Sequence, residues 1–219
     1  MPDLASYLIN NGIPAENFFL VLSIPFVALV ITFFRYIIGV RSFSIYEPLI
    51  IAYALYFISS DFLVGLKFGI PFILAIWLVG EIFSRLSKKS RLHHFSIISL
   101  KLSLASFFVI GVLFAAVYLG RSGFFSINAL PLIIMITLLE AVSVFQAKKG
   151  NFEANVLTLQ TLLLAIISYL LISTERFSNL LISNYYLVFM AILAIYWVGR
   201  YSGLKLSEFI RFRNVLKNE

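Results

Sequence analysis

Apolar runs long enough to cross a membrane follow one another along almost the whole sequence, and only short polar connections separate them. A transmembrane helix needs about 20 mostly apolar residues to cross a hydrocarbon core of about 30 Å. Of the 219 residues, 61% are hydrophobic and only 12% are charged, which is too few charges to coat a soluble protein of this size. The sequence therefore predicts an all-α polytopic membrane protein.

The polar breaks divide the chain into seven predicted transmembrane helices. The second is the shortest, and it either crosses the membrane obliquely or forms a partial helix lined by protein. The predicted spans are residues 18–38, 45–58, 62–84, 100–119, 127–146, 155–173 and 180–199.

The domain prediction follows from these spans. Residues 1–17 are expected to form a short segment at the membrane interface, because they are only mildly amphipathic. Residues 18–200 form the predicted seven-helix bundle, and residues 201–219 form a basic tail. The start of the chain lacks a basic leader and a cleavage site, so the first apolar run is expected to stay in the membrane.

Lysine and arginine are distributed unevenly between the two sets of helix ends. If the N-terminus is outside, the outer connections carry only Arg121 and Arg176, while most of the seventeen bases lie at inner ends. Cytoplasmic loops are enriched in these residues, so we expect an outer N-terminus and a cytoplasmic C-terminus. The net charge of +7 is spread over span ends and not over one polar face, so nucleic acid is not an expected partner.

Glu140 is the most unusual charge within the predicted spans, because no base lies one helical turn away. Ionisable residues inside membranes are costly and are functional hypotheses by default. We expect Glu140 to face the bundle, toward Arg35 or Arg41. Two roles stay open, namely an ion pair that holds helices together and a carboxylate that handles a substrate or a proton.

Other charges complete a candidate polar cluster. Glu81 is expected to pair with Arg85, four residues further along the same helix. Glu47 precedes Pro48 at a helix start, where a carboxylate complements the helix N-terminus. The cluster consists of Arg35, Arg41, Glu47, Glu81, Glu140 and Arg200.

Two stripes of small residues occur at helical spacing. Small side chains let membrane helices approach closely, so helix packing is the expected role, and a hydroxyl-lined path for a polar solute is the alternative. The stripes are Ser96, Ser99, Ser103 and Ser106, and Ala154, Thr158, Thr161, Ala165 and Ser168.

No catalytic motif is found in the sequence. It contains no nucleophile motif, no glycine-rich phosphate loop and no pair of intramembrane aspartates, so enzymatic activity is not expected. The pair His93-His94 has no further ligand nearby, and adjacent side chains point apart on a helix, so no metal is expected. No cofactor is predicted.

Three stretches resemble motifs of a bacterial family of seven-helix membrane domains usually fused to an inactive transglutaminase-like domain. Residues 38–43 (Ile-Gly-Val-Arg-Ser-Phe) with 47–52 (Glu-Pro-Leu-Ile-Ile-Ala) resemble the segment after its first helix. Residues 130–140 and 199–208 resemble two later motifs. Departures are Ser42 and Ser44, where the family tends to Thr and Gly, and Ala141, where it often has Arg.

The resemblance implies a multi-pass protein of the cell inner membrane that acts as a non-enzymatic scaffold or anchor in an envelope-associated system. No transglutaminase-like domain lies within these 219 residues. The resemblance therefore implies that this domain is either lost or supplied by another chain, so that a transglutaminase-like protein, or an ATP-grasp ligase encoded nearby, acts in trans. A transporter or flippase that uses Glu140 and the Ser/Thr stripes is the alternative, and a membrane enzyme is the third hypothesis.

Overall fold

The computed structural model describes residues 11–12, 14–87, 94–120, 124, 127 and 129–200. The predicted basic tail, His93 and most of the predicted interfacial segment lie outside these residues. The helices in the described part are α2 (Ala15–Phe33), the π-helix η1 (Phe34–Ile38), α3 (Tyr46–Ile58), α4 (Phe62–Ser87), α5 (His94–Tyr118), α6 (Ala129–Lys149), α7 (Asn151–Ile172), α8 (Glu175–Ser183) and α9 (Leu187–Gly199).

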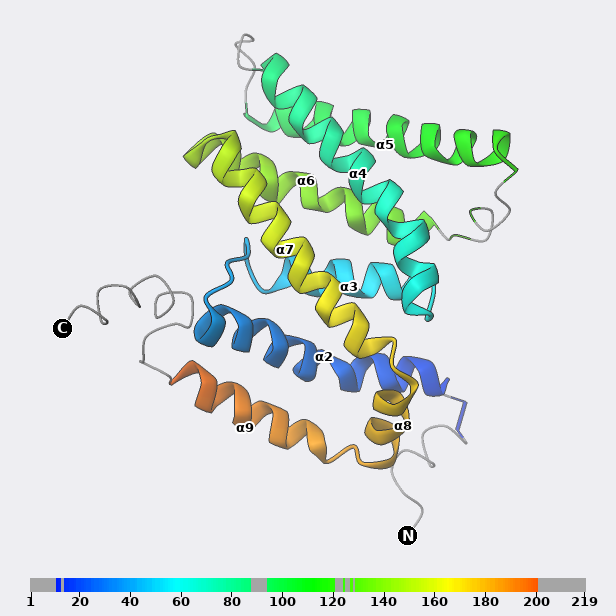
Figure 1. Cartoon of the computed structure of the whole chain (residues 1–219), viewed down its shortest axis with the longest axis vertical. Coiled ribbons are helices and arrows are strands. Elements are labelled where there is room, and N and C mark those ends of the chain that lie inside the picture. The colour runs from blue at the N-terminus through cyan, green and yellow to red at the C-terminus, as the bar shows by residue number, and fades with distance from the viewer. Residues whose placement is uncertain are drawn as a thin grey trace, which may run out of the picture.

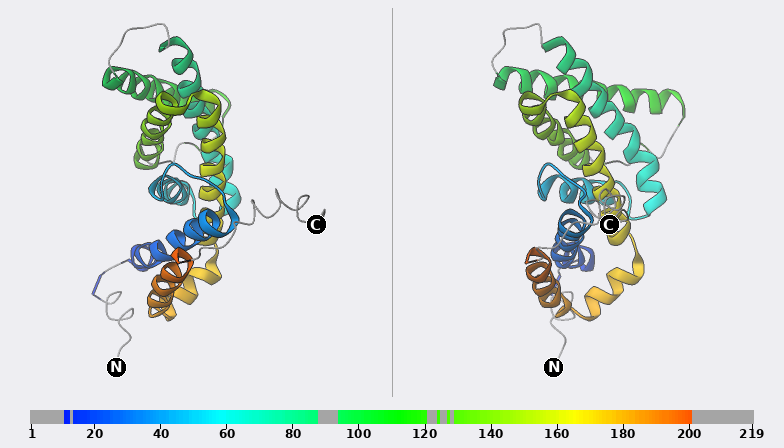
Figure 2. Two further views of the ribbon diagram at one scale, coloured as in Figure 1. Left: turned by 90° about the vertical axis from the view of Figure 1, so that its left-hand side faces the viewer. Right: turned by 60° about the vertical axis from the view of Figure 1, so that its left-hand side comes forward.

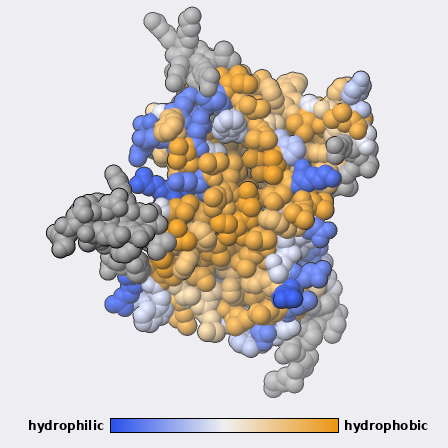
Figure 3. Space-filling view, viewed as in Figure 1, coloured by the Kyte–Doolittle hydropathy of each residue, from blue (hydrophilic) through white to orange (hydrophobic). Residues whose placement is uncertain are grey.

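Five helices lie side by side in the order α5, α6, α3, α2 and α9, and α4 and α7 cross one face of this row (Figures 1 and 2). α4 packs on α5, α6 and α3, whereas α7 packs on α6, α3 and α2. The face shown in Figure 3 carries an apolar band over the middle of the helices, with polar residues toward their two ends. This distribution is the one expected of a bundle that crosses a bilayer.

Among the described residues, five helical segments are long and apolar enough to span a membrane, namely the continuous stretch Ala15–Ile38 and segments of α4, α5, α6 and α7. The short α3 has 13 residues, so it is only about 20 Å long. It lies in the centre of the row, and its Ala52, Ala54 and Leu55 are fully buried. Neighbouring helices thus enclose a helix that is shorter than the hydrocarbon core, as the sequence allowed.

The predicted seventh span is not one continuous helix. α8 and α9 meet at an angle of 107°. Asn184 leaves the helical conformation with φ −131° and ψ 60°, and its side chain donates to Leu180 O at 3.2 Å and accepts from the Tyr186 hydroxyl at 2.8 Å. These local hydrogen bonds compete with those of a continuous helix, so the chain bends between α8 and α9.

The predicted connection between the fifth and sixth spans was too long. Lys148 and Lys149 continue α6, and Gly150 alone separates it from α7. Gly150 has φ +93°, a conformation that glycine adopts without steric cost. The two helices therefore reverse direction at a single residue.

The side chain of Tyr169 connects α7 to the turn between α3 and α4 by hydrogen bonds. The Tyr169 hydroxyl lies 2.7 Å from Ser59 O and 2.8 Å from Asp61 O. A Cβ atom at Gly65 would clash with this hydroxyl, so only glycine leaves room for it. Gly69, one turn further along α4, makes the same close approach to Leu55 of α3.

The two stripes of small residues have different surroundings. On α7, Thr158, Thr161 and Ser168 are buried against the bundle, as the packing prediction requires. On α5, Ser103 and Ser106 are exposed and donate to carbonyls of their own helix. Ser103 and Ser106 therefore do not pack against the described part of the chain, because α5 lies at the edge of the row and packs mainly on α4 and α6.

Candidate functional site

The connection between η1 and α3 builds the site. The Gly39 and Val40 amides both donate to Phe34 O, at 2.8 and 3.0 Å, and Gly39 adopts φ +94°. The chain then turns toward α7, where the Arg41 amide donates to Gln160 Oε1 at 3.3 Å. The Phe43 ring packs edge-on against Phe145 of α6, with ring centroids 5.6 Å apart. These two rings stand between two hollows in the surface.

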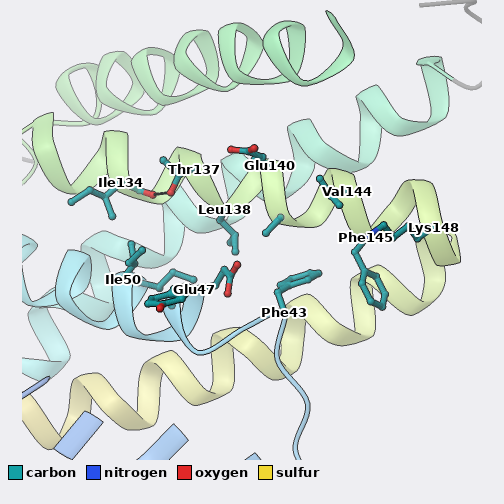
Figure 4. Close-up of a pocket in the computed structure, with 13 residues that line it drawn as sticks. Phe43, Glu47, Ile50, Ile134, Thr137, Leu138, Glu140, Val144, Phe145 and Lys148 are labelled. Carbon is teal, nitrogen blue, oxygen red and sulfur yellow. Dashed lines mark hydrogen bonds between the residues drawn. The ribbon is translucent and has the colours of Figure 1, made fainter. Parts of the chain in front are cut away.

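The first, which we call the acidic hollow, has a volume of about 450 Å³ and lies between α3 and α6 (Figure 4). No residue of α4 or α7 lines it, so it opens on the face of the row that those two helices leave uncovered. Its walls are mostly apolar. The charged residues in its lining are Glu47, Glu140 and Lys148.

Glu47 is held in the first turn of α3 by local hydrogen bonds. The Ser44 hydroxyl donates to Glu47 Oε2 and accepts from the Tyr46 amide at 3.0 Å. The Ser42 hydroxyl in turn donates to Ser44 O at 2.6 Å. The connection thus fixes the Glu47 carboxylate in the lining of the hollow, beside the N-terminus of α3.

Glu140 lies at the rim of the acidic hollow, near the middle of α6. It is nine residues before Lys149, or about 13 Å along the helix axis. The side chain is exposed and, among the described residues, forms no ion pair. In the view of Figure 4 the Leu138 side chain lies between the carboxylates of Glu140 and Glu47. Neither Arg35 nor Arg41 lines this hollow, so the structure places Glu140 away from the arginines that the sequence suggested as partners.

The second, which we call the basic hollow, has a volume of about 610 Å³ and lies beyond the two aromatic rings, between the connection, α6 and α7. Arg35 and Arg41 both line it, and Lys149 adds a third cation. Glu153 is the acidic residue in its lining. Four of the six residues of the candidate cluster are therefore divided by charge, with Glu47 and Glu140 on one side of Phe43 and Phe145 and Arg35 and Arg41 on the other.

Glu81 belongs to a different region, which we call the closed cluster. Lys101 of α5 is only 3% exposed, and its ammonium group donates to Ser143 Oγ at 2.9 Å and Gln146 Oε1 at 3.1 Å. Asn155 Nδ2 donates to Glu81 Oε2 at 3.1 Å. The cluster therefore comprises Glu81, Lys101, Ser143, Gln146 and Asn155, and the predicted partner Arg85 has a side chain outside the described set.

The closed cluster contains residues that the sequence analysis did not single out. The predicted span 100–119 puts Lys101 at a span end, but α5 begins at His94, about 10 Å earlier along the axis. Ser143 and Gln146 follow each other at a spacing of three on the buried face of α6. A polar pair at that spacing on a neighbouring span is the signal that could have found them.

Arg200 follows the last residue of α9 and is exposed. It lines neither hollow. Of the six residues in the candidate polar cluster, Glu47 and Glu140 thus line one hollow, Arg35 and Arg41 line the other, and Glu81 and Arg200 lie elsewhere.

The chemistry open to the acidic hollow is the binding of a cationic group. An exposed carboxylate in the apolar part of a membrane attracts a basic side chain from a partner, because transfer of either charge alone into hydrocarbon is unfavourable. Within the described ranges, no three histidine or acidic side chains are grouped so that they could hold a metal ion.

Comparison with known proteins gives one family match. A family model described as seven transmembrane helices usually fused to an inactive transglutaminase matches residues 8–216. No curated protein and no solved structure matches the chain. The match covers nearly the whole sequence and agrees with the helical membrane architecture described above. The chain therefore belongs to this family of seven-helix membrane domains usually fused to an inactive transglutaminase.

Proposed function

We propose that the chain is a non-enzymatic scaffold or anchor in the cell inner membrane, and that it holds a transglutaminase-like or ATP-grasp protein in trans. The observation that carries the proposal is the position of Glu140 at the rim of a hollow that opens sideways from the bundle. A charged residue at the centre of a membrane helix costs about 3 kcal/mol. A basic residue on a partner's transmembrane helix offsets that cost by pairing with Glu140.

The positions and hydrogen bonds of the Ser and Thr hydroxyls in the two stripes favour a scaffold over a transporter. Thr158 and Thr161 are buried and donate to carbonyls of α7 itself, each at 2.8 Å. Ser103 and Ser106 face outward from α5 and likewise donate within their helix. Neither stripe lines the acidic hollow, so these hydroxyls do not form a polar path that leads to Glu140.

Site-specific photo-crosslinking tests the docking of a partner. A photoreactive residue replaces Ala141, which lines the hollow, in cells that also express the transglutaminase-like protein of the same genome. The matched control position is Phe107, which is 72% exposed on α5. We expect an adduct with that protein from position 141 and none from 107, and Glu140→Gln should remove the adduct. Equal adducts from both positions, or an adduct that survives Glu140→Gln, would contradict the proposal.

A flux measurement tests the transporter alternative. The purified chain is reconstituted into vesicles that contain a pH-sensitive dye, and proton flux is compared with that of empty vesicles. A scaffold gives no flux above the empty vesicles. Flux that Glu140→Gln abolishes while the melting temperature stays unchanged would replace the scaffold by a transporter.

The proposed orientation has its own test. With the N-terminus outside and the C-terminus in the cytoplasm, tags fused to the two ends lie in different compartments. Protease added to intact spheroplasts should remove only the N-terminal tag. Removal of both tags, or of the C-terminal tag alone, would overturn the orientation.

A further inference from the structure

We propose that the basic hollow binds the phosphate group of an anionic phospholipid. Its three cations come from three separate elements. Arg35 lies on η1, Arg41 on the connection that follows, and Lys149 is the last residue of α6. Three chain segments thus converge on a single hollow of about 610 Å³ with side chains of the same charge.

These cations lack the partners that would neutralise them. Within the described parts of the chain, Arg35, Arg41 and Lys149 form no ion pair, and Glu153 is the acidic residue in the lining. The backbone amide of Arg41 is bonded to Gln160, so the position of this residue is fixed while its guanidinium group is left for a ligand. Arginine is well suited to phosphate, because its planar group donates two parallel hydrogen bonds.

The position of the hollow at the level of the helix ends favours a lipid over a soluble anion as its ligand. It lies at the ends of three spans, namely Ala15–Ile38, Ala129–Lys149 and Asn151–Ile172. Span ends meet the membrane at the level of the headgroups. Basic pockets between transmembrane helices are known to hold anionic headgroups at this level.

The lining also provides an apolar side for acyl chains. Phe152 is 81% exposed and Val156 is 43% exposed, and both lie in the first turns of α7 beside the cations. A free phosphate ion would gain nothing from these side chains, whereas a phospholipid buries part of its chains against them. The rings of Phe43 and Phe145 separate the hollow from Glu140, so lipid binding does not depend on the proposed docking of a partner.

Binding of short-chain lipids to the detergent-solubilised full chain tests this inference. The probes are phosphatidylglycerol, zwitterionic phosphatidylcholine and inorganic phosphate, each titrated at low salt. We expect phosphatidylglycerol to bind more tightly than the other two. Arg41→Gln should weaken its binding about fivefold, because a basic residue near an anionic headgroup contributes about that factor. Added salt should weaken it as well.

The matched control is Arg176→Gln, an exposed arginine on α8 that lines neither hollow. It should leave the affinity for phosphatidylglycerol unchanged. If Arg41→Gln does not fold, Lys149→Gln replaces it, since this exposed residue at a helix end is tolerant of change. Equal affinity for the two lipids, equal losses in Arg41→Gln and Arg176→Gln, or preferential binding of inorganic phosphate would each overturn the proposal.

Discussion

Glu81 and Glu140 are both carboxylates within apolar helices, but the fold surrounds them in opposite ways. Glu81 accepts a hydrogen bond from Asn155 and lies close enough to Lys101 to interact with its charge. Glu140 is exposed at the rim of the acidic hollow and forms no ion pair among the described residues. The closed cluster thus draws its hydrogen bonds from four helices of this chain, whereas the acidic hollow is suited to a partner's cation. The same residue type therefore supports the fold in one region and an interaction in the other.

The largest effect is expected in the closed cluster. Lys101→Ala removes two hydrogen bonds and leaves a cavity between α5 and α6, so it should lower the free energy of unfolding by about 3 kcal/mol. Unfolding in mixed micelles with increasing dodecyl sulfate measures this change. The exposed Lys148→Ala is the control and should change little. Equal stability of the two variants would show that Lys101 is not part of a closed cluster.

The two stripes of small residues allow a buried helix face, on α7, to be compared with an exposed one, on α5. Ser168 is fully buried on α7, so Ser168→Leu overfills the bundle and should destabilise it by about 2 kcal/mol. Ser103 is exposed on α5, so Ser103→Leu should leave the unfolding free energy unchanged. The same micelle titration compares them. A larger loss for Ser103→Leu would mean that α5 packs on its serine face.

Asn155→Ala tests the hydrogen bond to Glu81 with a smaller expected effect. Side-chain hydrogen bonds between membrane helices contribute about 1 kcal/mol, and we expect a loss of that order. The matched variant is Asn179→Ala on α8, where an exposed amide is replaced. The double variant Asn155→Ala/Glu81→Gln should therefore lose less stability than the sum of the losses in the two single variants. Equal values would show that the account of the cluster is wrong.

Glu140→Gln is expected to have the smallest effect on stability. Substitutions at exposed positions usually change the free energy of unfolding by less than about 0.5 kcal/mol. The variant should therefore unfold like the parent chain while it loses the crosslink to a partner. Strong destabilisation by Glu140→Gln would mean that this carboxylate holds the bundle together, which is the role left open by the sequence.

The sequence predicted the helical membrane architecture well because length and apolar content alone define a span. It could not predict which face of a span is buried. On α6 the buried residues include Leu138, Leu139 and Val142, but also Ser143 and Gln146. Both faces of such a helix are largely apolar, since lipid and protein interior make similar demands. The side on which Glu140 lies is therefore decided by the neighbouring helices and not by a pattern along the chain.

Two other features depended on local hydrogen bonds or on tertiary contacts. The break at Asn184 divides a run that is apolar enough to be read as one span, and the side chain of Asn184 forms local hydrogen bonds to Leu180 and Tyr186 at this point. The separation of Glu140 from Arg35 and Arg41 rests on the Phe43 and Phe145 pair. Contacts between residues so distant in sequence cannot be read from either segment alone.

The most direct test of the central claim is the lipid exposure of residue 140. The chain has no cysteine, so single cysteines can be placed at 140 and at 143, the buried position one turn further along α6. Each is spin-labelled in the purified chain and reconstituted into bilayers, and the collision frequency with dissolved oxygen is measured. We predict a frequency several times higher at 140 than at 143. An equal or lower frequency at 140 would show that Glu140 faces the interior of the bundle, and it would contradict the account given above.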